Sequence, residues 1–274
     1  MKVLIPTDFS ASARSAFDYG YQLVKEFSGV EIILLNSYEM PKVGASGGVM
    51  MNLEDAMAKE SQRDLSIELR ELNSLYPDAE IKTVSRYGTL ENSINRTCNE
   101  EKVDFIVMGT HGASGLKKAL IGSNTQSVIE NSEIPVISVP RDWKFKKIQN
   151  IVYATDLNRL ENPEILTPIC ELAETEGATI HIVYVAKSKS EIDLEKEIEN
   201  LPLNEYFNKR PRKFAIIESE NVADGIDSFV KKIEADLVVM IPKEATFWES
   251  LFKRSVTEQL AFQSKVPLLS LRDK

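Results

Sequence analysis

The sequence predicts an α/β protein made of two tandem, doubly wound domains, each with a parallel five-stranded sheet. Short apolar runs of strand length alternate with stretches whose apolar residues recur at helical spacing. Several runs are apolar on both faces, as buried parallel strands require, and the landmarks of the first half recur in the second half. Because the chain has 274 residues, two copies of a half-length domain account for all of it.

The first half contains five predicted strands separated by helices. The helix after the first strand has Ser10 as its capping residue and stops at Gly29. Residues 40–48 form a predicted loop before a long second helix. The predicted strands cover Val3–Ile5, Val30–Leu35, Glu80–Arg86, Val103–Met108 and Pro135–Pro140, and the later helices cover Leu53–Leu75, Thr89–Glu101 and Thr125–Asn131. This alternation predicts right-handed crossovers, with helices on both faces of the sheet.

The second half repeats these landmarks in the same order. For example, Ile151–Leu157 corresponds to Val3–Phe9, and the later strands have counterparts as well. A polar, lysine-rich connector lies between the halves at residues 141–149. The predicted domains are therefore residues 1–141 and residues 148–274.

A glycine-rich stretch follows the fourth strand of the first half. Gly109 and Gly112 come after the strand, and Gly122 with Ser123 precedes the next helix. The N-terminus of a helix leaves backbone N–H groups without partners, and these groups can hold an anion. Asp8 follows the first strand, and ligands of such sheets bind at the carboxyl ends of the strands. The pattern predicts a nucleotide site whose phosphates lie in the glycine loop.

The second half lacks the residues that this chemistry needs. The counterparts of the three loop glycines are Ile241, Glu244 and Arg254, and only Ser255 matches its counterpart, Ser123. These three side chains are costly at the positive φ angles that glycine adopts, and Glu244 would repel a phosphate. We therefore expect nucleotide binding in the first half alone.

Together these residues resemble the fingerprint of the universal stress protein family in its tandem-domain form. The fingerprint G-x2-G-x9-G-[ST] is present from Gly109 to Ser123, together with Asp8 and a closing Pro-Val-x-x-Val at residues 135–139. The resemblance covers the whole chain and implies a Rossmann-like fold of the adenine nucleotide α-hydrolase type. It also implies that the two domains pair through their last strands as an intramolecular pseudo-dimer. Because members with the full motif typically bind ATP, it implies an ATP-binding regulatory protein of the stress response.

Carried over position by position, the resemblance assigns nucleotide contacts in two groups. Residues at the ends of the first, second and fourth strands lie at the base and ribose. The helix N-terminus and the loop glycines hold the phosphates through backbone N–H and hydroxyl groups, and His111 lies within that loop. The assigned positions are Pro6, Thr7, Asp8, Ser37, Met108, Gly109, His111, Gly112, Gly122, Ser123, Asn124 and Thr125.

Each of these signals also has an interpretation without a ligand. The glycines can serve turns, Asp8 can offset the dipole of the following helix, and Ser123 with Thr125 can cap the next helix. His111 can be an exposed loop residue. Asn36 and Ser37 also depart from the His-Val pair that members often have at the end of the second strand.

Composition narrows the class of function. The net charge of −9 argues against non-specific binding to nucleic acid or to a membrane surface, and no apolar run has the length of a membrane span. Cys98 and Cys170 are expected to be free, buried thiols of a cytoplasmic protein. No catalytic residue and no metal cluster is assigned. The expected cofactor is ATP, with or without Mg²⁺, and two tandem chains can pair again as a homodimer.

Two other functions stay open at this point. One is a weak ATP hydrolase or phosphotransferase in which Asp8 holds Mg²⁺ and His111 assists. The other is a nucleotide-free protein-interaction module that acts through its paired domains.

Overall fold

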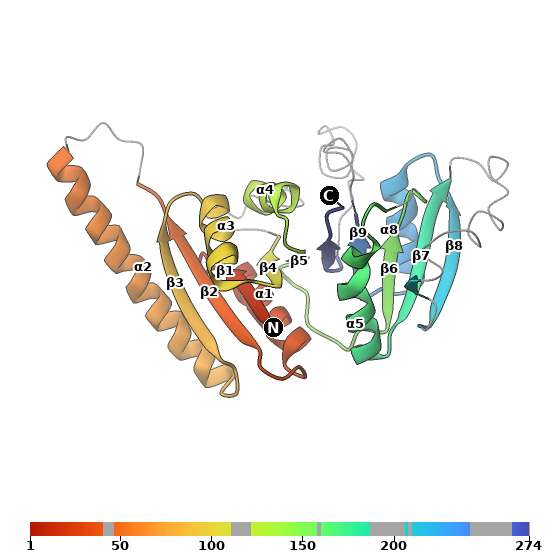
Figure 1. Ribbon diagram of the computed structural model, residues 1–274, viewed down its shortest axis with the longest axis horizontal. Helices are drawn as coiled ribbons and strands as arrows, with labels where there is room; N and C mark the ends of the chain where they lie inside the picture. The colour runs from red at the N-terminus through yellow and green to blue at the C-terminus, as the bar shows by residue number, and fades with distance from the viewer. Residues whose placement is uncertain are drawn as a thin grey trace. The chain divides into compact units, whose positions relative to one another are not determined.

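Strands and helices alternate along the chain, and the paired strands within each half run parallel, as the sequence predicts (Figure 1). The chain divides into two units, Met1–Phe145 and Lys146–Lys274. The computed structural model describes residues 1–40, 47–110, 122–157, 160–186, 206–207, 210–241 and 265–273.

The first unit has a parallel sheet in the order β3-β2-β1-β4-β5. Its strands are β1 (Lys2–Pro6), β2 (Glu31–Tyr38), β3 (Ile81–Tyr87), β4 (Phe105–Gly109) and β5 (Val136–Val139). Its helices are α1 (Ala11–Val24), α2 (Gly47–Leu75), α3 (Leu90–Glu101) and α4 (Ser123–Asn131). The order of the strands reverses between β1 and β4, so the switch point of the sheet lies between these two strands.

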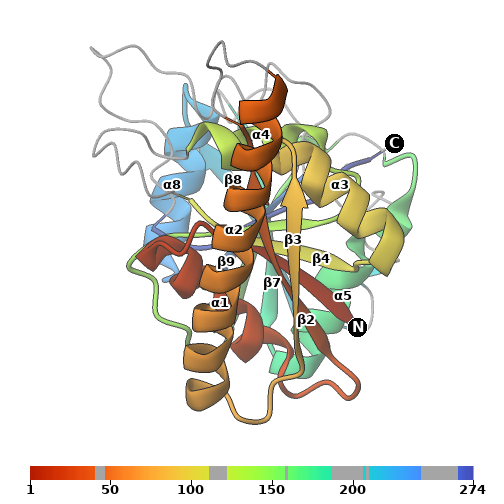
Figure 2. The same cartoon turned by 90° about the vertical axis from the view of Figure 1, so that its left-hand side faces the viewer.

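Helices cover both faces of this sheet. Figure 2 looks onto the first unit and shows α1 and α3 on opposite sides of the strands, while α2 runs alongside β2 and β3. On one face, Arg14 of α1 pairs with Glu68 of α2 at 2.7 Å. On the other face, Ser127 of α4 donates a hydrogen bond to Glu91 of α3 at 2.7 Å. The core between these layers consists of the inward side chains of the strands, which are almost fully buried.

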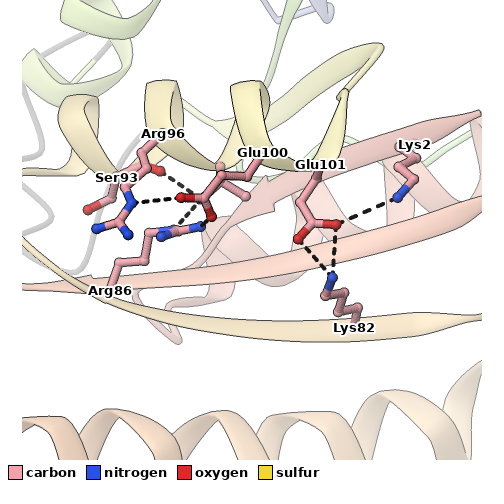
Figure 3. A network of polar contacts seen from close by, with 8 residues as sticks. Lys2, Lys82, Arg86, Ser93, Arg96, Glu100 and Glu101 are labelled. Carbon is pink, nitrogen blue, oxygen red and sulfur yellow. Dashed lines mark hydrogen bonds and ion pairs between the residues drawn. The ribbon is translucent and has the colours of Figure 1, made fainter.

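Two carboxylates of α3 tie that helix to the edge of the sheet (Figure 3). Glu101 pairs with Lys82 of β3 at 2.8 Å, and Glu100 pairs with Arg86 of β3 and with Arg96 of its own helix. The hydrogen bond from Arg96, followed by that from Arg86, lowers the pKa of Glu100, and the bond from Lys82 lowers the pKa of Glu101. Glu100 is open to water, so its pairs contribute little to stability, whereas the Glu101 side chain is only 18% exposed.

The second unit has a parallel sheet in the order β8-β7-β6-β9-β10. Its strands are β6 (Asn150–Ala154), β7 (Thr179–Ala186), β8 (Arg212–Glu218), β9 (Leu237–Met240) and β10 (Leu268–Ser270). Its described helices are the 3-10 turn η1 (Pro163–Leu166), α5 (Thr167–Glu176) and α8 (Val222–Lys232). Each strand of the second unit thus matches one of the first unit in order and direction.

The same backbone turn follows the first strand of each unit, which confirms the duplication. Thr7 Oγ1 accepts a hydrogen bond from the N–H of Phe9, and Thr155 Oγ1 accepts one from the N–H of Leu157. Phe9 and Leu157 both have a φ of 61°, in the left-handed region that bulky side chains rarely adopt. The presence of this unusual turn in both units indicates that they share one backbone architecture.

A buried carboxylate closes the amino-terminal end of the second sheet. Asp236 accepts hydrogen bonds from the N–H groups of Gln149 and Asn150 at 2.8 and 2.9 Å, and Lys146 Nζ lies 2.7 Å from it. In the first unit the counterpart, Asp104, accepts from the N–H of Lys2 at 2.7 Å. Both carboxylates accept from backbone N–H groups at the amino-terminal ends of β1 and β6.

The element boundaries differ from the predicted ones in a few places. Ser10 caps α1, as predicted, because its hydroxyl accepts from the N–H of Ala13 at 3.2 Å. The predicted loop at residues 40–48 is wrong at its end, because α2 already begins at Gly47 instead of Leu53. A long helix extends cooperatively into residues of low helix propensity once its first turns exist.

Both cysteines are free and buried, as predicted. In the described part of the chain, no helix combines the length and the apolar character needed to span a membrane.

We expect Asp236→Ala to destabilise the second unit by about 2–3 kcal/mol, because two strand N–H groups lose a charged acceptor. Hydrogen exchange of the β6 amides under denaturant measures this change. Asp227→Ala is the control, since it removes an exposed pair with Lys231 on one helix and should cost less than about 1 kcal/mol. Equal costs for the two variants would contradict the role given to Asp236.

Both thiols should resist modification in the folded protein. Burial raises the pKa of Cys98 and of Cys170 to about 11, so at pH 8 both groups are protonated and covered. A chromogenic disulfide reagent should titrate no thiol in buffer and two thiols in denaturant. Rapid reaction of one thiol in buffer would show that the structure burying this thiol opens in the folded protein.

Candidate functional site

A pocket opens at the carboxyl ends of β1, β2 and β4, where the strand order reverses. This is the position at which open α/β sheets bind ligands. Its cavity volume is about 240 Å³. The lining residues are Pro6, Thr7, Asp8, Ala13, Asn36, Ser37, Leu90, Met108, Gly109, Gly122, Ser123, Asn124 and Thr125.

The end of β1 forms one wall of the pocket and is held by its own backbone. The N–H of Thr7 donates to the carbonyl of Leu35 at 2.8 Å, which extends the β1–β2 ladder by one bond. Asp8 is exposed, and its Oδ1 accepts a hydrogen bond from the N–H of Ser10 at 3.1 Å. The turn therefore presents a carboxylate to solvent beside the start of α1.

The end of β4 and the start of α4 form the opposite wall. The hydroxyl of Thr125 donates to the carbonyl of Gly109 at 2.9 Å, and the N–H of Gly122 donates to the carbonyl of Thr110 at 2.6 Å. The N–H of Thr110 in turn donates to Val139 of β5 at 3.0 Å. These bonds hold the start of α4 against the end of β4.

The first turn of α4 supplies donors for an anion. Its N-cap is Gly122, which has no side chain to accept from the helix amides. Helix geometry leaves the N–H groups of Ser123, Asn124 and Thr125 without an acceptor inside the helix. These groups and the positive end of the helix dipole favour a negative group at this end of the pocket.

The sequence profile of the universal stress protein family matches residues 1–140 and again residues 147–272. The chain belongs to this family. Universal stress protein MJ0577 of Methanocaldococcus jannaschii is 30% identical over 156 residues, which cover 51% of this chain and 94% of that protein. MJ0531 of the same organism is 29% identical over 143 residues, covering 52% of this chain and 84% of that protein.

A solved structure extends this likeness to the whole fold. The crystal structure of a universal stress protein from Archaeoglobus fulgidus covers 100% of this chain and 98% of its own, with a TM-score of 0.73 and 19% identity. This likeness shows that the two chains share their fold.

The structure brings together most of the positions that the family resemblance assigns. All of them line the pocket except His111 and Gly112, which lie outside the described residues. Sequence reasoning missed Ala13 and Leu90. Leu90 follows the carboxyl end of β3, so its place beside the switch point was open to prediction, whereas Ala13 carries no chemical signal.

Three details of the predicted site are wrong. Gly122 has a φ of −65°, and Gly109 is likewise not among the described residues with a positive φ. Ser123 and Thr125 do not cap α4, since the N-cap is Gly122. The Thr125 hydroxyl donates its hydrogen to the carbonyl of Gly109 and not to a phosphate. That its backbone N–H holds a phosphate stays a prediction.

Close packing, and not backbone conformation, explains the glycine at position 109. A Cβ atom there would lie 2.3 Å from Ser12 Oγ and 2.7 Å from the Ser12 carbonyl oxygen. A real Cβ cannot approach backbone atoms so closely, and no rotation of a side chain would relieve the contact. The first glycine of the fingerprint thus lets α1 pack against the end of β4.

We expect Gly109→Ala to destabilise the first unit by about 1–3 kcal/mol through this overpacking. Gly20→Ala is the matched control in α1. The tightest contact of its new Cβ would be the end of the Ile5 side chain, at 3.0 Å, and Val107 would lie at an ordinary contact distance of 3.5 Å. Because alanine also favours the helix, stability should change by less than about 1 kcal/mol. Urea unfolding measures both variants, and a larger loss for Gly20→Ala would refute the packing role.

Proposed function

We propose that this universal stress protein binds ATP in the pocket of its first unit and acts as an ATP-dependent regulator. One observation carries the proposal: the glycine-capped N-terminus of α4 lies at the switch point, in the same pocket as Asp8. The first feature suits a phosphate, and the second can accept hydrogen bonds from the polar edge of a nucleoside.

The size of the pocket supports a division of the ligand into two parts. The described lining encloses about 240 Å³, less than the roughly 300–1,000 Å³ of most small-molecule sites. We therefore place the nucleoside between Asp8 and Met108 and the phosphates along the first turn of α4. The terminal phosphate then extends past Gly122.

The second unit differs from the first at the positions that matter for this proposal. Ile241 follows β9 at the place where Gly109 ends β4. In the first unit α1 starts at Ala11, soon after β1 ends, whereas η1 and α5 start only at Pro163 and Thr167. We propose that the second unit binds no nucleotide. The cytoplasmic location, the pairing of the two domains through their last strands, and the homodimer stay predictions.

We expect Asp8→Asn to weaken ATP binding about tenfold, because an uncharged amide oxygen replaces a charged acceptor. Asp156→Asn is the matched control, since Asp156 occupies the same turn in the second unit and should leave the affinity unchanged. Isothermal titration calorimetry with ATP, in the presence of Mg²⁺ and in the presence of EDTA, measures both variants.

Gly122→Val gives an independent test at the phosphate end. A branched side chain at the N-cap should abolish detectable ATP binding while circular dichroism shows a folded chain. Wild-type protein that gives no heat with ATP, or a Gly122→Val variant that binds as well as wild type, would overturn the proposal.

A further inference from the structure

A chain of buried polar side chains leads from the pocket wall to α2. Asn36 lines the pocket, and its Nδ2 donates to the carbonyl of Thr7 at 2.8 Å. Ser61 of α2 donates its hydroxyl to Asn36 Oδ1 at 2.7 Å, and Ser61 Oγ lies 2.7 Å from Ser85 Oγ of β3. Asn36 and Ser61 are only 9% and 5% exposed. These groups therefore satisfy one another away from bulk water.

The available donors and acceptors fix the direction of each hydrogen bond in this series of side chains. A carbonyl oxygen can only accept, so the amide of Asn36 must turn its NH₂ group toward Thr7. Ser61 then uses its one O–H group for Asn36, which leaves Ser85 as the donor to Ser61. The bonds run from β3 through α2 to the pocket wall, and such consecutive bonds strengthen one another.

In the second unit, the equivalent strands β7 and β8 carry other side chains at these positions. The strand register places Tyr184 and Ile216 at the positions of Asn36 and Ser85. An aromatic and an aliphatic residue are therefore compatible with this fold. The strand pairing itself therefore does not require the amide and hydroxyl groups that the pocket-bearing unit has at these positions.

We propose that Asn36 is a positioning residue for the nucleotide and that Ser61 couples occupancy of the pocket to the packing of α2. This proposal rests on the proposed ATP binding. The carbonyl held by Asn36 belongs to the peptide that joins Thr7 to Asp8, so a ligand that orders Asp8 also orders Asn36. By linkage, such a ligand stabilises the contact with α2, and α2 packing raises the affinity for the ligand.

The rest of α2 is anchored separately, which makes this coupling local. Arg14 pairs with Glu68 at 2.7 Å, and the hydroxyl of Tyr76, just after the helix, donates to Asp18 at 2.8 Å. These contacts hold the carboxyl-terminal half of α2 to α1. Ser61 is the central residue of α2 and precedes both of these contacts, so the part of the helix before Glu68 is the part that responds to the pocket.

The test compares Ser61→Ala with Ser66→Ala in the full chain. Ser66 is an exposed residue of the same helix whose hydroxyl donates only to the Gln62 carbonyl among described contacts. ATP affinity is measured by calorimetry, and hydrogen exchange of residues 53–66 is measured with and without ATP. Ser61→Ala should weaken ATP binding about three- to tenfold and abolish the ATP-dependent protection of that segment. Ser66→Ala should change neither.

Two further variants keep the test decisive. Ser61→Cys is nearly isosteric and a weak donor, so it should act as Ser61→Ala does even if the alanine variant folds poorly. Ser61→Thr keeps a hydroxyl and should restore both readouts. If the wild type binds ATP while the Ser61 variants keep full affinity and full protection, the coupling is wrong and ATP binding stands. If the wild type does not bind ATP, the proposed function fails and the coupling fails with it.

Discussion

The close contact between the end of β4 and the first turn of α1 sets the geometry of the site. Only a residue without a side chain fits at Gly109, because Ser12 of α1 lies against it. At the same residue, the Thr125 hydroxyl donates to the Gly109 carbonyl and ties α4 to the end of β4. Gly109 thus contacts both α1 and α4, and the first turn of α4 lines one pocket together with Asp8.

Comparison of the two units distinguishes the features that serve the fold from those that serve the site. Both units keep the turn in which a threonine hydroxyl accepts from a left-handed residue, at Phe9 and at Leu157. That turn therefore serves the fold, whatever ligand is present. The differences fall at Gly109, which Ile241 replaces, and at Asn36, which Tyr184 replaces. The proposed function depends on these differences, which point to the first unit as the one that binds a nucleotide.

Much of this architecture could be predicted because it follows from the spacing of apolar residues along the sequence. Parallel strands that are apolar on both faces, and helices with one apolar face, leave clear patterns, and the repeat of these patterns shows two domains. The pairing of Asn36 with Ser61 could not be predicted, since it joins residues 25 positions apart through tertiary packing. The packing role of Gly109 was hidden for the same reason, because a glycine's sequence context does not show what lies against it.

If one of the two similar units holds a nucleotide, the full chain has a single ATP site. Equilibrium dialysis of the purified full chain against radiolabelled ATP counts the sites per chain. We expect saturation at one ATP per chain. Saturation at two would show that the second unit also binds, and the absence of binding would show that the pocket at the switch point does not hold this nucleotide.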